Sequence, residues 1–327
     1  MSRLVKYRES LVRFIKDKSI LLNNNSVGDP NFEPFLYSKI KNDDLLLSIV
    51  FLTIMNSQNK KNKITLQGYY AASSIEMLNI IVDISENSEK YNKDFYYRII
   101  NFLTTCSFKS FYQNLESIKS FVDQNLSSSV FFDSMDVFTN NVFESKFNEE
   151  FIWKITEDGP NKDLIKWYLK NNEECKDNFN NLKMVKKECF EDFINNKIGA
   201  LSEIAFSISW IMGCGSIKLL PKIKKMSKNF AWMYKIALDF DNIEDDLSTD
   251  GLNFSKNYVV NYGLQESYEK FMDNKQKMIE ELMVLEIYTI TIKEIMNYIE
   301  EKVDRIIDET SPDLKSNFSN ISNILSV

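Results

Sequence analysis

Apolar residues recur along this chain with the spacing of amphipathic helices. Close to the N-terminus, five of them fall at positions i, i+3, i+7, i+10 and i+11 and therefore share one helical face. These residues are Leu4, Tyr7, Leu11, Phe14 and Ile15. The segment 23–30, which is rich in Asn and contains Gly and Pro, predicts a loop that ends this helix.

Longer apolar blocks follow, and they predict helices of the protein core. Residues 45–55 and 66–84 form two such blocks, separated by the polar stretch 58–63. Between 127 and 162, phenylalanines are spaced unevenly among acids and amides, so this middle segment is predicted to be irregular. Helical spacing returns in the second half of the chain, at 164–170, 185–213 and 223–246, and continues to about residue 308 after an interruption at 248–251.

Turn-forming residues are scarce. The 327 residues include 8 glycines and 5 prolines, far below the average usage of about 12%. This scarcity argues against sandwiches, barrels and sheets with many turns, and we predict an all-α fold. Because no repeat and no sharp change in composition divides the chain, we expect residues 1–327 to form a single helical domain.

Charge and composition exclude several classes of function. Lys and Arg total 40 against 47 Asp and Glu, a net charge of -7, which disfavours nucleic acids or anionic membranes as the main partner. The chain has no histidine, so His bases, Ser-His or Cys-His pairs and His-ligated metals are excluded. The four widely separated cysteines predict buried thiols. With no signal peptide and no transmembrane run in the sequence, a cytoplasmic protein is expected.

A polar stripe runs along the predicted core helix 66–88. Its members fall at i, i+3, i+7, i+10 and i+11, while the residues between them are nearly all apolar. Such a stripe either faces solvent or, if it is buried, requires a cation, a partner or a water-filled cavity. The stripe consists of Glu76, Asn79, Asp83, Glu86 and Asn87.

A second acidic group lies late in the chain, at 239–246. Asp241 and Asp245 are one helical turn apart, and a divalent cation such as Mg²⁺ would relieve their repulsion. The alternative is an acidic helix end followed by a loop. A calcium loop beginning at Asp246 is a third interpretation, but Asn257 stands where a bidentate Glu is needed.

Two lysines flank these acidic segments. Lys197 lies at the start of a strongly apolar helix, within 196–201, and Lys256 follows the second acidic group. Each is either a functional cation or an ordinary surface lysine.

In this order, the motifs resemble the trans-isoprenyl diphosphate synthases, or polyprenyl synthetases, and most closely the competence-pheromone isoprenyl transferases of Gram-positive bacteria. The likeness runs from about Tyr37 to Gly263. Residues 45–78 are similar to the region that leads to the first aspartate-rich motif of the family. The other matching segments are 196–201 for the Lys-Thr-Gly-x-Leu motif, 241–245 for the second aspartate-rich motif and 255–256 for a Gly-Lys diphosphate contact.

Both acidic motifs depart from the pattern of the family. Where Asp-Asp-x-x-Asp is expected, the segment 86–90 reads Glu-Asn-Ser-Glu-Lys and keeps one acid, Glu86, at the three metal positions. Asn242 replaces the second Asp of the later motif. The basic loop near 38–41 lacks its arginines, and no Arg-Arg pair follows the first motif.

The resemblance implies an antiparallel helix bundle of the class I isoprenoid (terpenoid) synthase type, with Mg²⁺ bridging two acidic helices and holding a prenyl diphosphate. It assigns the metal to Asp83, Glu86, Asp241 and Asp245. It further implies that Lys197 and Lys256 stabilise the leaving diphosphate during catalysis, and that Lys39 and Lys41 bind a diphosphate.

The function implied is a Mg²⁺-dependent enzyme acting on prenyl diphosphates, by prenyl transfer or by terpene-type cyclisation. The alternative is a catalytically silent homologue that serves as a regulatory or partner-binding subunit, as the degraded first motif suggests. A generic helical interaction protein is the third interpretation. Relatives of this fold are commonly dimers, so a homodimer or a heterodimer with an active homologue is expected, and nucleic acid is not an expected partner.

Overall fold

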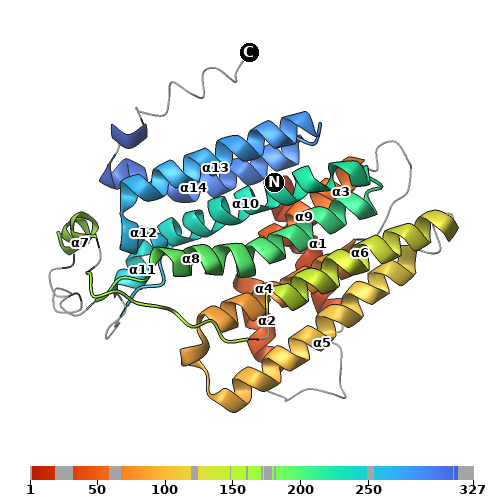
Figure 1. Ribbon diagram of the computed structural model, residues 1–327, viewed down its shortest axis with the longest axis horizontal. Helices are drawn as coiled ribbons and strands as arrows, with labels where there is room; N and C mark the ends of the chain where they lie inside the picture. Colours follow the sequence, from red (N-terminus) through yellow and green to blue (C-terminus); the bar gives the residue numbers. More distant parts are fainter. Residues whose placement is uncertain are drawn as a thin grey trace. The chain divides into compact units, whose positions relative to one another are not determined.

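Most of the part of the chain that the structure describes is helical. In the computed structural model (Figure 1), the described residues are 2–18, 32–58, 68–118, 124–147, 149–159, 161–170, 172, 179, 182–248, 254–311 and 313–315. Within these ranges β-structure is confined to two isolated bridges, Ile155 with Val185 and Lys183 with Phe254. The all-α prediction is therefore confirmed.

The α-helices are α1 (Arg3–Lys18), α2 (Phe32–Asn42), α3 (Leu46–Gln58), α4 (Tyr69–Glu86), α5 (Lys93–Ile118), α6 (Gln124–Glu144), α7 (Lys162–Leu169), α8 (Lys187–Phe193), α9 (Gly199–Met212), α10 (Leu220–Asp241), α11 (Ile243–Ser248), α12 (Tyr258–Tyr262), α13 (Leu264–Val284) and α14 (Ile290–Thr310). Short helical turns lie at η1 (Ser88–Lys90) and η4 (Ile217–Leu219), and η3 (Ile194–Ile198) is a π-helical turn.

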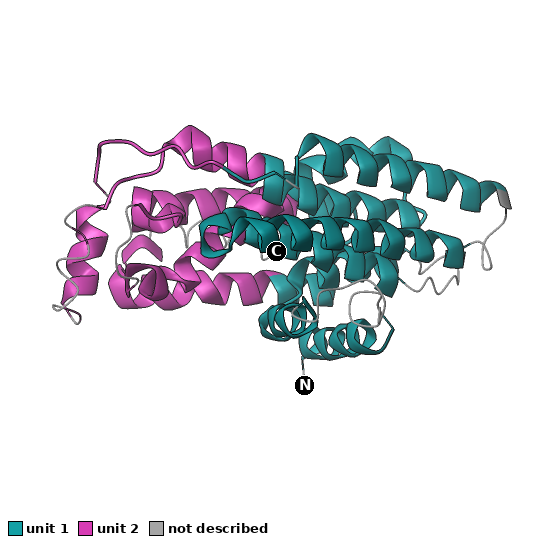
Figure 2. Ribbon diagram, turned by 90° about the horizontal axis from the view of Figure 1, so that it is seen from below, with its two compact units in different colours: residues 1–151, 196–228, 281–295 teal, residues 152–195, 229–280, 296–327 magenta. Residues whose placement is uncertain are grey.

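The chain divides into two compact units, coloured separately in Figure 2. Unit 1 comprises 1–151, 196–228 and 281–295, and unit 2 comprises 152–195, 229–280 and 296–327. The predicted loop 23–30, and most of the predicted polar stretches 58–63 and 248–251, lie outside the described residues.

Helix α4 lies at the centre of unit 1. It packs against α1, α3, α5 and α9, and α9 packs in turn against α3 and α6. Small residues allow the close approach of α4 and α5: Ser74 Oγ donates a hydrogen bond to Ser107 O at 2.8 Å, and Ser110 Oγ to Tyr70 O at 2.8 Å. The predicted helices at 45–55 and 66–84 are therefore real core helices.

The predicted irregular segment 127–162 is wrong for its first part, because α6 continues to Glu144. Its buried face combines Val130, Val137 and Phe138 with the small polar residues Ser127 and Ser134. These serines interrupt the apolar spacing, although they occupy the same helical face. Within 127–162, irregular and extended backbone is confined to the described residues between α6 and α7.

Aromatic packing holds unit 2 together. Trp153 packs on Phe190, with ring centroids 5.2 Å apart. Tyr258 packs on Phe190 at 5.6 Å and on Trp232 at 5.9 Å, and only 1% of Tyr258 is exposed. Such aromatic contacts bury large apolar rings and fix α8, α10 and α12 within this unit.

Candidate functional site

The predicted polar stripe of α4 faces charged groups on and after α2, all of them in unit 1. Lys39 Nζ lies 2.5 Å from Asp83 Oδ2. Asn79 Nδ2 donates to Asp43 Oδ2 at 3.2 Å, and Asn87 Nδ2 donates to Asp83 Oδ1 at 3.2 Å. The cation that a half-buried stripe requires is therefore a lysine of this chain.

Lys39 and Lys41 have different surroundings, although both were predicted to bind a diphosphate. Burial lowers the pKa of Lys39, but the hydrogen bond and charge of Asp83 outweigh burial, so the net shift is upward. Lys41 is exposed. Because positions i and i+2 point to different sides of a helix, only Lys39 contacts the stripe.

The deepest acid of the stripe is a buried carboxyl group, Glu76, which is 2% exposed. Its Oε1 has no hydrogen-bond partner among the described residues. Burial, followed by the charge of Asp43, raises the pKa of Glu76 to about 8, although hydrogen bonds from Ser48 and Asn79 act in the opposite direction. Burial likewise raises the pKa of Asp43. Glu76 is therefore mostly protonated at neutral pH.

In unit 2, Asp241 is held by two cations of α14. Lys302 Nζ lies 2.6 Å from Oδ2, and Arg305 contacts Oδ1 at 2.7 Å. The side chains of Asp241 and Lys302 are only 25% and 14% exposed. Both oxygens of the carboxylate are therefore already paired with positive charge.

Asp245 lies beyond a helix break. Helix α10 ends at Asp241, α11 begins at Ile243, and Asp245 is exposed on α11. Its neighbour Asp246 accepts a hydrogen bond from Asn257 Nδ2 at 2.8 Å. The side-chain oxygen of Asn257 caps α12 by accepting from the backbone N–H groups of Val259 and Val260. That oxygen is therefore committed to the helix cap, which argues against a calcium loop ending at Asn257.

A buried ion pair that sequence reasoning missed lies on α10, two residues before Asp241. Lys235 Nζ is 2.9 Å from Asp239 Oδ1, and their side chains are 9% and 4% exposed. Asp239 Oδ2 also accepts the backbone N–H of Tyr258 at 2.8 Å. Opposite charges at i and i+4 on an apolar helix were the available signal.

Lys197 points into unit 1. It is 4% exposed and lies within the π-helical turn η3, and its ammonium group donates hydrogen bonds to the carbonyl oxygens of Lys146 and Glu149, the latter at 3.3 Å. Burial lowers the pKa of Lys197 to about 8. In this arrangement Lys197 fixes the turn that follows α6.

The other predicted catalytic lysine, Lys256, is half-buried in unit 2, directly before the cap residue Asn257.

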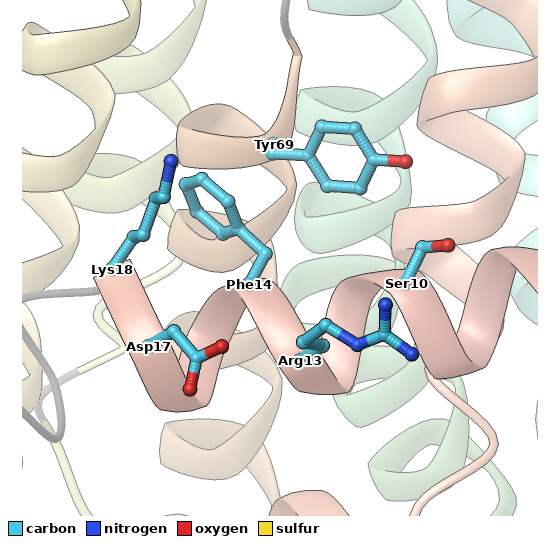
Figure 3. Close-up of a pocket in the computed structure, with 6 residues that line it drawn as sticks. All are labelled: Ser10, Arg13, Phe14, Asp17, Lys18 and Tyr69. Atoms are coloured by element: carbon cyan, nitrogen blue, oxygen red, sulfur yellow. The ribbon is translucent and has the colours of Figure 1, made fainter.

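A separate hollow of about 220 Å³ lies on unit 1 (Figure 3), where Phe14 packs against Tyr69 with ring centroids 5.4 Å apart. It is lined by Ser10, Arg13, Phe14, Asp17, Lys18 and Tyr69. None of the predicted site residues lines this hollow.

The predicted metal ligands are divided between the two units, so their joint Mg²⁺ site stays a prediction. Asp83 and Glu86 lie in unit 1, Asp241 and Asp245 in unit 2. Mg²⁺ requires free carboxylate oxygens in near-octahedral geometry, but Asp83 holds Lys39 and Asp241 holds Lys302 and Arg305. Among the described residues, no three acidic or cysteine side chains gather into a group suited to a metal ion.

Comparison with known proteins identifies the fold. No protein-family model and no curated protein matches the sequence. A solved structure of a geranyltransferase from Helicobacter pylori, complexed with magnesium and isoprenyl diphosphate, matches 93% of this chain and 99% of its own length, with TM-score 0.54 and 12% identity. An FPP/GFPP synthase from Zymomonas mobilis matches 90% and 98%, with TM-score 0.51 and 12% identity. The chain therefore has the all-α fold of these prenyl diphosphate synthases.

Proposed function

We propose that this protein is a catalytically silent homologue of prenyl diphosphate synthases that acts as a regulatory or partner-binding subunit in the cytoplasm. The observation that carries the proposal is the pairing of Asp241 with Lys302 and Arg305. A motif that binds Mg²⁺ must present unpaired oxygens, and two cations already compensate this carboxylate.

The first acidic segment supports the same conclusion. Only Glu86 remains at the three expected metal positions, and the nearest further acid of the helix, Asp83, is paired with Lys39. The proposal assigns these acids to ion pairs that stabilise the fold. That this chain is most closely related to the competence-pheromone isoprenyl transferases stays a prediction.

Exposed aromatic residues on α5 and α6 are the surface that we assign to the partner. Tyr97 and Tyr112 on α5 are 52% and 48% exposed, and Phe132 and Phe143 on α6 are 69% and 84% exposed. Phe132 and Phe143 are eleven residues apart, which places them on one face of α6. Aromatic residues are enriched at protein interfaces, so we expect a second copy of this chain or an active homologue to cover this surface.

The catalytic part of the proposal is tested by incubating the purified protein with Mg²⁺ and geranyl, farnesyl or geranylgeranyl diphosphate. We expect no release of diphosphate, while circular dichroism shows an intact helical fold. Turnover of any of these substrates refutes the proposal. The partner surface is tested by light scattering, where Phe132→Ser/Phe143→Ser lowers the oligomeric mass and Ile152→Ser, an exposed residue of unit 2, leaves it unchanged.

The second candidate function is a Mg²⁺-dependent prenyltransferase or terpene synthase. It is favoured by the fold, which matches along more than nine-tenths of a synthase solved with magnesium and isoprenyl diphosphate. The double variant Asp241→Asn/Asp245→Asn separates the candidates. An enzyme would lose Mg²⁺-dependent binding of prenyl diphosphate, whereas a silent subunit has no such binding to lose and keeps its partner.

A further inference from the structure

One end of unit 1 carries a concentration of positive charge. Residues 204–228, all of them in unit 1, contain five lysines and no acid, within a chain whose net charge is -7. Lys218 is exposed on the turn η4 between α9 and α10, and Lys222, Lys225 and Lys228 are exposed on the first turns of α10. A local positive potential is therefore expected at this end, although the whole protein is acidic.

Aliphatic side chains protrude at the same end. Ile217, beside Lys218, is 49% exposed. At the end of α13 and the start of α14, Val284 and Ile290 are 63% and 61% exposed, whereas Leu285, in the turn between these helices, is 7% exposed. Leu285 therefore anchors the turn in the core, whereas Val284 and Ile290 are exposed to solvent and do not contribute to the core.

An ion pair and the course of the helices place the two turns together. Lys225 Nζ, near the start of α10, lies 3.3 Å from Glu281 Oε1, near the end of α13. Both turns belong to unit 1, and Figure 1 shows them at the same end, on the right of the view. Lysines and aliphatic side chains therefore share one surface, on which Glu286 is an exposed acid.

The turn between α9 and α10 is braced from inside. Trp210, 3% exposed, donates its indole N–H to Ser216 O at 2.9 Å. A Cβ added at Gly215 would lie 2.3 Å from the indole ring, so the backbone passes directly over Trp210. Ile217 and Lys218 are thus presented on a preformed support, which lowers the entropy cost of binding.

We propose that this end of unit 1 docks onto an anionic membrane surface. Ile217, Val284 and Ile290 enter the boundary between headgroups and acyl chains, and the exposed lysines contact the lipid phosphates and carboxylates. Exposed aliphatic side chains favour a lipid surface over nucleic acid, which has no apolar layer to receive them. None of the described helices is long and apolar enough to cross a bilayer, so docking is peripheral. It does not depend on whether the protein is catalytic.

Sedimentation of the full chain with lipid vesicles tests the proposal. One set of vesicles contains phosphatidylcholine alone and the other an equal mixture of phosphatidylcholine and phosphatidylserine. We expect binding to the anionic vesicles only. The variant Lys218→Glu/Lys222→Glu/Lys228→Glu should weaken it by about 100-fold, and Val284→Ser/Ile290→Ser by about tenfold.

Matched control variants test whether binding depends on this particular surface or only on the net charge and hydrophobicity of the protein. The variant Lys109→Glu/Lys162→Glu/Lys186→Glu changes the net charge equally, at exposed lysines elsewhere. The variant Ile152→Ser/Ile155→Ser removes exposed aliphatic residues of unit 2. Circular dichroism checks that every variant is folded.

Three outcomes overturn the proposal. The first is an absence of binding to anionic vesicles by the folded wild-type protein. The second is an equal loss of binding in the control variants. The third is binding to heparin or DNA as tight as to the vesicles, with no effect of Val284→Ser/Ile290→Ser, which would identify a general polyanion site.

Discussion

Replacing Glu76 with Gln should stabilise unit 1 and remove a dependence of its stability on pH. In the folded protein the pKa of Glu76 is raised from the ordinary 4.5 to about 8 by burial and by Asp43. The folded state therefore keeps a proton that the unfolded chain releases above pH 4.5. By linkage, the contribution of Glu76 to stability is fully present below pH 4.5 and is lost as the pH rises through 8.

The magnitude follows from the difference between the two pKa values. Each pH unit between them costs about 1.4 kcal/mol, so at pH 7 the wild-type protein has lost about 3 kcal/mol relative to pH 4.5. Gln is uncharged at every pH, so it avoids the cost of a buried negative charge and puts an amide of similar size in place of the carboxyl group. For a unit of about 200 residues, 3 kcal/mol corresponds to a rise in melting temperature of roughly 6–12 °C.

Thermal unfolding followed by circular dichroism from pH 5 to pH 9 measures this effect. The gap between Glu76→Gln and wild type should widen with pH and level off above pH 8. Glu89→Gln, a change at an exposed acid shortly after α4, is the matched control and should follow the wild-type curve. Parallel curves for Glu76→Gln and wild type, or a less stable variant at pH 8, would refute a protonated Glu76.

Further predictions concern packing and ion pairs. Asp239→Asn removes the carboxylate that faces buried Lys235 and should cost about 3–5 kcal/mol in urea unfolding. Gly215→Ala forces a Cβ against Trp210 and should cost about 1–3 kcal/mol, measured by thermal unfolding. Lys39→Met breaks a partly exposed pair with Asp83, so its cost should be about 1 kcal/mol or less and should shrink in high salt. Costs below 1 kcal/mol for Asp239→Asn or Gly215→Ala, or above 3 kcal/mol for Lys39→Met, would contradict these assignments.

Helical spacing was sufficient to predict the elements with continuous apolar faces. Leu11 and Ile15 are buried on α1, and the apolar blocks became α3 and α4. Helix α6 was not predicted, because Ser127 and Ser134 occupy its buried face. Small serine side chains pack well there, but serine is not counted as an apolar residue in the helical pattern.

The candidate site shows what spacing alone does not reveal. The polar stripe of α4 was recognisable, because Asp83 lies about two turns from Glu76 and about one turn from Asn79 along the same face. Its counter-ion was not, since Lys39 is 44 residues away in the chain. Lys302 and Arg305 lie about sixty residues from Asp241, so their pairing is likewise a product of tertiary structure.

Cys214 provides a site for selective thiol labelling in the α9–α10 turn. This residue has a free thiol and a left-handed backbone conformation, with φ of 61°, and it is partly accessible, whereas Cys106 and Cys189 are buried. Burial raises the pKa of the Cys214 thiol, so alkylation should be slow but selective among these three. In a Cys175→Ser background, a polarity-sensitive dye could be attached at Cys214, three residues from Ile217. Its fluorescence would then report the polarity around the α9–α10 turn.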